Sequence, residues 1–428
     1  MNKLYSTESK KERVVLIGTV KPGHSREEAE YTLNELALLA ESAGNEVYGR
    51  YFQSLKQVNS TYFIGKGKSL EIAEAIRACD IDTIIFNDDL TPIQQKNLSE
   101  LFNKKVIERT GLILEIFAQN ARTREAKTQV ELAQLEYILP RLTGQWKHLE
   151  RQVGGIGVRA GMGEKQLEID RRLTKNRIKK LKEELINLDN QRKTSIKRRK
   201  GFFKVTLIGY TNAGKSTLFN ALVPPLPGET GVIVADRLFA TLDSTIRRLE
   251  LKDHFIILLA DTVGFIRKLP HTLIASFRST LSIVRDADLL LNIVDISRSN
   301  FEEQISAVKT VLTEMEITEI PIINVFNKID LINDDSIIPS ARHGYPGAVF
   351  ISAQLGIGIN TLLDKINGIA ESHREEHTFI IPLNDSKTIA HLFTAGEVLE
   401  QKYNGEYTTL TVRLTSENAA RFKEWIES

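Results

Sequence analysis

The stretch around residue 209 restricts the fold of this chain more than any other part of its sequence. An apolar run, Val205–Ile208, has the composition of a buried strand, and it leads into Gly209-Tyr210-Thr211-Asn212-Ala213-Gly214-Lys215-Ser216. These eight residues match the pattern G-x-x-x-x-G-K-[ST], and the residues that follow can form a helix. A strand, a glycine-rich loop and a helix in this order predict an α/β domain built around the loop.

The residue types in this loop are those that bind phosphate. Glycines let backbone N–H groups approach phosphate oxygens, and the start of the following helix adds positive potential. Lys215 can reach the β- and γ-phosphates of a nucleotide, the Ser216 hydroxyl can coordinate Mg²⁺, and Thr217 lies next to them. A chance glycine-rich turn would seldom also place Lys-Ser at the start of a helix, so we disfavour a purely structural loop.

Two further segments supply groups for the same site. Asp261-Thr262-Val263-Gly264 follows a strand-like run; its Asp261 carboxylate can hold Mg²⁺, usually through a water, and its Gly264 N–H can sense a γ-phosphate. Thr241, in Phe239-Ala240-Thr241-Leu242-Asp243, is our candidate for the switch threonine that closes on Mg²⁺ when a nucleoside triphosphate is bound. We therefore expect Mg²⁺ at Ser216 and Thr241, with Asp261 bound through water.

Two more motifs predict which base is bound. Asn327-Lys328-Ile329-Asp330 follows an apolar run and resembles the guanine-specificity motif of the GTPase superfamily, in which the Asp accepts two hydrogen bonds from guanine. Adenine presents the wrong hydrogen-bonding pattern and would leave this carboxylate unpaired. Ser352-Ala353-Gln354 resembles the companion motif that contacts the guanine carbonyl. In this order and spacing, the motifs predict a chain that binds GTP and GDP and hydrolyses GTP.

The sequence does not reveal a catalytic base. Phe265 follows Gly264, at a position where many GTPases have a glutamine that orients the attacking water. A phenyl ring cannot orient water, so Phe265 is a packing residue, the mark of a slow enzyme that needs outside help, or both. Asn212 could hold K⁺ beside the phosphates, as its counterpart does in certain related GTPases, or simply hydrogen-bond the switch backbone.

Around the phosphate loop the chain divides into four predicted regions. Residues 1–120 alternate strand-like runs with helical spacing, which indicates a small α/β domain with a parallel sheet. Residues 121–200 are predicted to form an antiparallel hairpin of two long helices with a glycine-rich basic loop at its tip. Residues 201–373 form the nucleotide domain. Residues 374–428 form a small α+β domain, with a helix predicted over residues 388–403.

The predicted hairpin carries much of the positive charge of the chain. Apolar residues from Leu132 to Leu142 and from Ile178 to Leu188 step by three and four, which is the spacing of a helical seam. From Lys147 to Lys204 there are eighteen Lys and Arg against seven Asp and Glu, in a chain whose net charge is only +2. Such a segment favours a polyanionic partner, although solvated helix faces would give the same composition. Four loop residues suit RNA, because cations neutralise phosphates and an indole can stack on bases: Trp146, Lys147, Arg151 and Arg159.

The composition also disfavours other classes of protein. The chain has no run of eighteen apolar residues, and its first residues are polar and basic, so we expect neither a transmembrane segment nor a signal peptide. The single cysteine, Cys79, cannot form an internal disulfide, which favours a cytoplasmic protein in a reducing compartment. Its simplest role is that of a small core residue.

Taken together, these motifs resemble those of the HflX family of ribosome-associated GTPases. Besides the nucleotide motifs and Phe265, the resemblance rests on five further segments within residues 1–372: 62–68, 109–114, 121–125, 129–135 and 163–172. The loop departs from the family pattern, because Val158 to Lys165 replaces the usual T-R-G-P-G-E-T. We therefore carry over no detailed loop geometry.

The resemblance implies a factor that binds the large ribosomal subunit and its RNA. It would insert the hairpin loop near the peptidyl-transferase centre and split stalled or idle ribosomes, as a monomer with no DNA partner. Two alternatives remain open: an RNA-binding module whose nucleotide site only stabilises the fold, and an ATP-driven RNA-remodelling enzyme that uses the N-terminal domain. Gly65-Lys66-Gly67-Lys68 is the only sequence hint of the latter, and it is not a complete phosphate loop.

Overall fold

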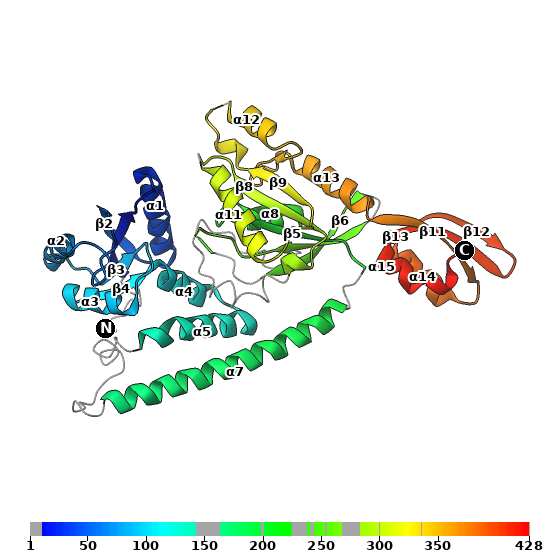
Figure 1. Cartoon of the computed structure of the whole chain (residues 1–428). Coiled ribbons are helices and arrows are strands. Elements are labelled where there is room, and N and C mark those ends of the chain that lie inside the picture. Colours follow the sequence, from blue (N-terminus) through cyan, green and yellow to red (C-terminus); the bar gives the residue numbers. More distant parts are fainter. Residues whose placement is uncertain are drawn as a thin grey trace, which may run out of the picture. The chain divides into compact units, whose positions relative to one another are not determined.

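The fold comprises two compact units, shown in a computed structural model (Figure 1). The structure describes residues 11–142, 163–197, 201–224, 238–239, 244–252, 255–267, 283–298, 300–334 and 336–427. The N-terminal unit comprises Met1–Ile186, Asp236–Leu242 and Leu269–Phe277. The C-terminal unit comprises Asn187–Ala235, Asp243–Lys268 and Arg278–Ser428.

The N-terminal unit contains a four-stranded parallel sheet in the order β2-β1-β3-β4. Its strands are β1 (Arg13–Val20), β2 (Glu46–Ser54), β3 (Thr83–Phe86) and β4 (Lys105–Glu108). Its helices are α1 (Arg26–Ser42), α2 (Lys66–Arg77), α3 (Pro92–Phe102) and α4 (Arg109–Asn120). All four residues of β3 are buried, as expected for a central parallel strand covered on both faces. The predicted α/β class of this region is confirmed.

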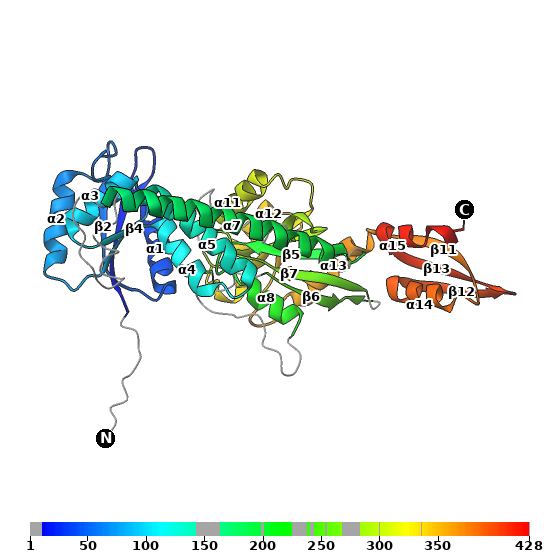
Figure 2. The ribbon, with the colours of Figure 1, turned by 90° about the horizontal axis from the view of Figure 1, so that it is seen from below.

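A helical hairpin follows the sheet. It consists of α5 (Arg124–Ile138), a short 3-10 turn η1 (Leu139–Arg141) and the long α7 (Gly163–Lys197), and α5 and α7 lie side by side in Figures 1 and 2. The ion pairs Arg124–Glu184 and Glu131–Arg177 show that the two helices are antiparallel. Their seam buries Leu132, Ile178 and Leu181, with Leu135, Leu139 and Leu185 packed against it.

The first helix of the hairpin ends earlier than its leucine spacing predicts. The apolar pattern continues to Leu142, but α5 stops at Ile138. Pro140 lies two residues further on, and a proline inside a helix lacks an N–H donor and clashes with the preceding turn. The predicted tip loop up to residue 162, including Trp146, Lys147, Arg151 and Arg159, lies outside the described residues. Gly163 and Glu164, at its predicted end, are instead the first residues of α7.

The nucleotide domain is a six-stranded sheet in the order β10-β9-β8-β5-β7-β6, in which β6 alone pairs antiparallel. The strands are β5 (Lys204–Gly209), β6 (Thr245–Glu250), β7 (Ile256–Asp261), β8 (Leu289–Asp295), β9 (Ile322–Asn327) and β10 (Val349–Phe350). The helices are α8 (Lys215–Leu222), α11 (Phe301–Glu314), α12 (Ile337–Gly344) and α13 (Ile359–Glu371), with a 3-10 turn η3 (Ile329–Leu331). Gly209, Asp261 and Asn327 each end a strand, so parallel pairing brings the predicted motifs to one edge of the sheet.

The last region is an antiparallel sheet in the order β11-β13-β12. It comprises β11 (Arg374–Pro382), α14 (Ser386–Ala395), β12 (Glu397–Asn404), β13 (Tyr407–Thr415), α15 (Ser416–Arg421) and a 3-10 turn η4 (Lys423–Trp425). The small α+β domain is thus confirmed. The helix predicted over residues 388–403 is confirmed as far as Ala395, but the prediction was wrong for the remaining residues, most of which form β12.

The chain leaves the helix at Gly396. A Cβ atom at this position would lie 2.7 Å from the Arg413 carbonyl oxygen and 2.8 Å from the Leu414 Cβ, so only glycine permits this approach of the two backbones. Beyond it, residues 397–404 pair along β13. Hydrogen bonding to a neighbouring strand has overridden the helical propensity of this stretch. No helix among the described residues is long and apolar enough to cross a membrane.

Candidate nucleotide site

The phosphate loop joins the end of β5 to the start of α8, as its sequence predicts (Figure 1). Two of its glycines are required by the geometry. Gly209 (φ 139°) and Gly214 (φ 93°) both have positive φ values, which L side chains rarely adopt. A Cβ atom at Gly209 would collide with the Ile293 backbone, and one at Gly214 would collide with the Asn327 amide. The loop is thus packed tightly against β8 and against the end of β9.

Lys215 is buried at the first position of α8. Its Nζ donates to the carbonyl oxygens of Tyr210, at 2.7 Å, and Gly209, at 3.1 Å. Burial lowers the pKa of Lys215 to about 8, and the nearby Asp261 carboxylate opposes this shift only in part. Neutral carbonyl oxygens compensate a buried ammonium poorly, whereas a phosphate would compensate it fully.

Asp261 and Ser216 come together at the ends of β7 and the phosphate loop. The Ser216 hydroxyl donates to Asp261 Oδ2 at 2.7 Å, and the Asp261 side chain is fully buried. Burial raises the pKa of Asp261, against the opposing effects of Lys215 and of the Ser216 hydrogen bond. Its Oδ1 has no hydrogen-bond partner among the residues that the structure describes. A hydroxyl beside a buried carboxylate with a spare oxygen is a donor set that suits Mg²⁺.

The predicted base motifs meet through Asn327. Its Nδ2 donates to the Ala213 carbonyl oxygen at 2.8 Å, and its Oδ1 accepts from the Ala353 N–H at 2.9 Å. Asn327 therefore ties the phosphate loop to the Ser352–Gln354 segment. Asp330 is exposed on the short turn η3, so its carboxylate is accessible to a base.

The switch segment is described only in part. Phe239 belongs to the N-terminal unit, where its ring packs edge-on against Phe117 with centroids 4.8 Å apart. Asn120 Nδ2 also donates to the Phe239 carbonyl oxygen at 2.8 Å. Ala240, Thr241, Leu242 and Asp243 lie outside the described residues, so the expected Mg²⁺ contact of Thr241 remains a prediction.

Sequence reasoning missed two features of the site. Phe265 is buried, as its predicted packing role requires, but its backbone also joins the phosphate loop. Thr211 N–H donates to the Phe265 carbonyl oxygen at 2.8 Å, and the Phe265 N–H donates to that of Gly209 at 3.0 Å. Asp295, at the end of β8, accepts hydrogen bonds from Lys328 and Ser297, at 2.7 and 2.5 Å. A carboxylate directly after a buried strand was the available signal for Asp295. Nothing in the sequence indicated the backbone pairing of Phe265.

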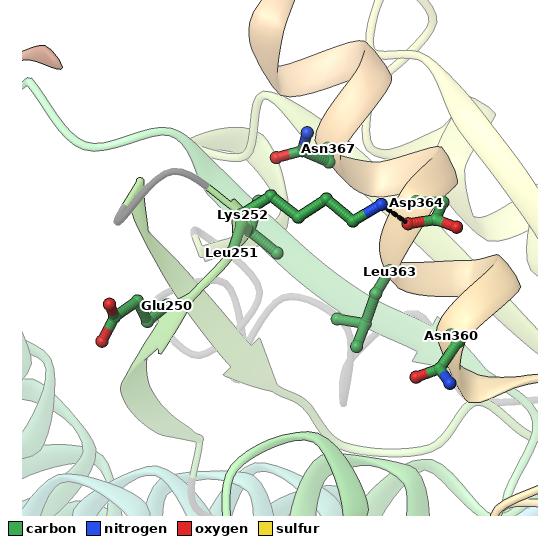
Figure 3. Close-up of a pocket in the computed structure, with 7 residues that line it drawn as sticks. All are labelled: Glu250, Leu251, Lys252, Asn360, Leu363, Asp364 and Asn367. Carbon is green, nitrogen blue, oxygen red and sulfur yellow. Dashed lines mark ion pairs between the residues drawn. The ribbon is translucent and has the colours of Figure 1, made fainter.

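A hollow away from these motifs on the C-terminal unit has a volume of about 380 Å³ (Figure 3). Lys252 and Asp364 form an ion pair across it, with Nζ and Oδ1 2.7 Å apart. Its remaining lining residues are Glu250, Leu251, Asn360, Leu363 and Asn367. None of these belongs to a nucleotide motif, so the hollow is not part of the candidate site.

Comparisons with known proteins agree with this geometry. Family models described as "GTP-binding GTPase N-terminal", "GTP-binding GTPase Middle Region" and "50S ribosome-binding GTPase" match residues 30–118, 120–199 and 204–328. The GTPase HflX of Magnetococcus marinus is 42% identical over 427 residues, covering 99% of this chain and 97% of that protein. The chain belongs to the HflX family of GTPases.

Other HflX proteins support the same assignment. That of Caldanaerobacter subterraneus is 42% identical over 98% of this chain and 94% of its own length. That of Escherichia coli is 43% identical over 89% of both chains. As an HflX-family member, the chain binds guanine nucleotides and hydrolyses GTP. The predictions of family, fold class and enzyme class are confirmed.

Proposed function

We propose that this HflX-family GTPase binds the large ribosomal subunit in its GTP state, splits stalled or idle ribosomes, and leaves after hydrolysis. The observation that carries the proposal is the match of residues 204–328 to a family described as a 50S ribosome-binding GTPase, joined in one chain to a basic helical hairpin. A GTPase serves as such a switch when one nucleotide state favours the bound conformation. The compartment would be the cytoplasm, where ribosomes are translating.

The exposed charge of α7 suits ribosomal RNA. Several of its basic side chains are exposed: Arg171, Arg172, Lys175, Lys179 and Lys180. Arg177 and Lys182, by contrast, form ion pairs with Glu131 and Glu136 of α5. One set of cations is thus paired within the hairpin, and the other can neutralise phosphates. Trp146, Lys147, Arg151 and Arg159 of the tip loop would add RNA contacts.

The nucleotide contacts that we propose are those predicted from the motifs. Residues 209–217, 261–264, 327–330 and 352–354 would surround the nucleotide, and residues 239–243 would close over it. Mg²⁺ would be held by Ser216 and Thr241, with Asp261 acting through a water. Bound Mg²⁺ would neutralise charge that develops on the phosphates. K⁺ at Asn212 would add a second positive charge there.

One experiment tests the proposed function directly. GTP hydrolysis is measured alone and with each purified ribosomal subunit, while intact ribosomes are followed by sedimentation with GTP or a non-hydrolysable analogue. We expect stimulation by the large subunit, none by the small subunit alone, and splitting that requires a nucleoside triphosphate. A matched variant with residues 144–164 replaced by a short Gly-Ser turn should bind GTP normally and fail to split ribosomes. Splitting by this variant at the normal rate would contradict a role for the loop.

A further inference from the structure

The third residue of the phosphate loop, Thr211, carries a hydroxyl that the fold itself does not use. Thr211 is 6% exposed, and its Oγ1 is buried with no hydrogen-bond partner among the described residues. Its backbone N–H is already engaged with the Phe265 carbonyl oxygen, so the loop conformation does not depend on the hydroxyl. A buried hydroxyl without a partner destabilises the folded protein, and valine would fill the same shape without that cost.

The Thr211 side chain lies beside the groups expected at the γ-phosphate. A Cβ atom built on Gly264 would lie 2.8 Å from Thr211 Cγ2 and 2.9 Å from Lys215 Nζ. Thr211, Gly264 and the Lys215 ammonium thus converge on one point in the C-terminal unit. The methyl of Thr211 makes this contact, and a ~120° rotation about χ1 would bring the hydroxyl to the position of the methyl, while the methyl moves to that of the Cβ hydrogen.

The residue that follows the neighbouring motif, Phe265, has no side-chain group that can orient water. Phe265 follows Gly264, and its ring is 2% exposed within the domain. Hydrolysis of GTP nevertheless requires a water held in line with the bond that breaks. A hydroxyl can both accept a hydrogen bond from that water and donate one to a γ-phosphate oxygen. Among the residues of the phosphate loop, Thr211 carries a hydroxyl that one χ1 rotation brings to this position.

We propose that the Thr211 hydroxyl is a catalytic residue that orients the attacking water. The water oxygen forms a bond to the γ-phosphorus while the bond from that phosphorus to the β–γ bridging oxygen breaks. The electron pair of the broken bond stays with GDP, and the proton of the water passes to the released phosphate. Thr211 is unchanged at the end of the reaction. The inference rests on the GTPase activity of the family and is independent of ribosome splitting.

The test is a matched pair of variants in the full chain, without ribosomes. Thr211→Val keeps the side-chain shape and removes the hydroxyl, whereas Thr211→Ser keeps the hydroxyl. We expect Thr211→Val to lower kcat about tenfold or more, with KM and the Kd values of GTP and GDP within about threefold, because orientation acts in the transition state. Thr211→Ser should keep kcat within about threefold of the unmodified enzyme.

Thermal stability separates this role from a structural one. The melting temperature of Thr211→Val should equal or exceed that of the unmodified protein, because a buried unpaired hydroxyl is removed. Thr262→Val serves as the stability control: the Thr262 hydroxyl is also buried but donates to the Leu207 carbonyl oxygen at 2.6 Å, so its removal should lower the melting temperature. A Thr211→Val enzyme with unchanged kcat would overturn the proposal. So would a loss of kcat accompanied by an equal loss of GTP affinity, or by a lower melting temperature.

Discussion

The parallel sheet of the N-terminal unit and the mostly parallel sheet of the nucleotide domain both have polar side chains near the carboxyl ends of their strands, but these side chains are paired differently. In the N-terminal sheet, Arg109 donates to Glu35 and, at 3.2 Å, to Asn87, while Arg141 pairs with Glu108. In the nucleotide domain, Asp261 Oδ1 and Thr211 Oγ1 are buried without partners among the described residues, and buried Lys215 donates to neutral carbonyl oxygens. Two sheets of similar topology therefore differ in whether the polar groups at their strand ends are left available for a ligand.

The comparison bears on the alternative of an ATP site in the N-terminal domain. The Gly65-Lys66-Gly67-Lys68 segment opens α2, where Gln53 accepts from the Gly65 N–H at 2.9 Å and Lys68 pairs with Glu71. Asp88, at the end of β3, is paired with Thr19 and Lys21 at 2.7 and 2.8 Å. These groups are satisfied by their own chain. The geometry thus disfavours an ATP site in the N-terminal domain and favours the sheet of the nucleotide domain as the place of nucleotide chemistry.

The largest expected effect comes from breaking the buried ion pair between Arg109 and Glu35 in the N-terminal unit. Arg109→Met leaves the buried carboxylate of Glu35 without its cation, and losing one partner of a buried pair typically costs about 3–5 kcal/mol. Denaturant unfolding should show this loss, while the Kd of GTP stays unchanged. The double variant Glu35→Leu with Arg109→Met should recover most of the stability. If Arg109→Met keeps its stability but loses GTP binding, the polar groups of the N-terminal sheet serve nucleotide binding and not the stability of the fold.

The next effect concerns the base. Replacing Asp330 with Asn removes an acceptor for two guanine N–H groups, each bond to a charged group being worth about 1.5–3 kcal/mol. GTP affinity should therefore fall by about 3 kcal/mol or more, and xanthosine triphosphate should become the preferred nucleotide because its extra carbonyl accepts from the Asn amide. Competition binding with GTP, ATP and xanthosine triphosphate measures the change. Equal affinity of the unmodified protein for ATP and GTP would rule out this role for Asp330.

The pKa of Lys215 predicts a pH dependence. In the folded protein the pKa is about 8, against an ordinary value of 10.5, and bound phosphates would raise it again. GTP affinity should be flat below pH 8 and should fall above it by up to about 1.4 kcal/mol per pH unit, with proton uptake on binding. Calorimetry in buffers of different ionisation enthalpy, between pH 7.5 and 9, measures that uptake. Binding without proton uptake at pH 9 would show that Lys215 keeps its proton in the free protein.

The lowered pKa of Lys215 also affects the stability of the protein without nucleotide. Its effect on stability with rising pH is opposite to its effect on GTP affinity. Between about pH 8 and 10.5 the unfolded chain holds a proton on Lys215 that the folded chain has released. The contribution of this lysine to the free energy of unfolding should therefore rise with pH across that window. Comparison with Lys215→Met, which cannot titrate, isolates the contribution.

The smallest expected effect concerns potassium. Asn212 has a positive φ of 60° and lies within the phosphate loop, half-buried. If its side-chain oxygen holds K⁺ beside the phosphates, hydrolysis should be several-fold faster in potassium than in sodium at matched ionic strength, because the cation stabilises developing charge. Equal rates in the two salts would favour the simpler role, a hydrogen bond to the switch backbone.

The sequence predicts most of the nucleotide site because its motifs depend on local geometry. Lys215 follows directly from the phosphate-loop pattern, and the positions of Asp261 and Asn327 follow from the strands that they end. The pairing of Lys328 with Asp295 and the packing of Phe239 on Phe117 connect residues that are far apart in the chain, which a motif cannot reveal. The missed strand β12 has the same cause, since its hydrogen bonds are made to β13.

The most direct test of the account is nucleotide hydrolysis by Lys215→Ala in the full chain. We expect all nucleotide chemistry at the ends of β5, β7 and β9, where Lys215 supplies the buried cation for the phosphates. The variant should therefore lose GTP hydrolysis by at least about a hundredfold, together with any ATP hydrolysis that the unmodified protein shows. ATP turnover that survives in the variant would reveal a second nucleotide site elsewhere in the chain. It would contradict the claim that only the sheet of the nucleotide domain carries nucleotide chemistry.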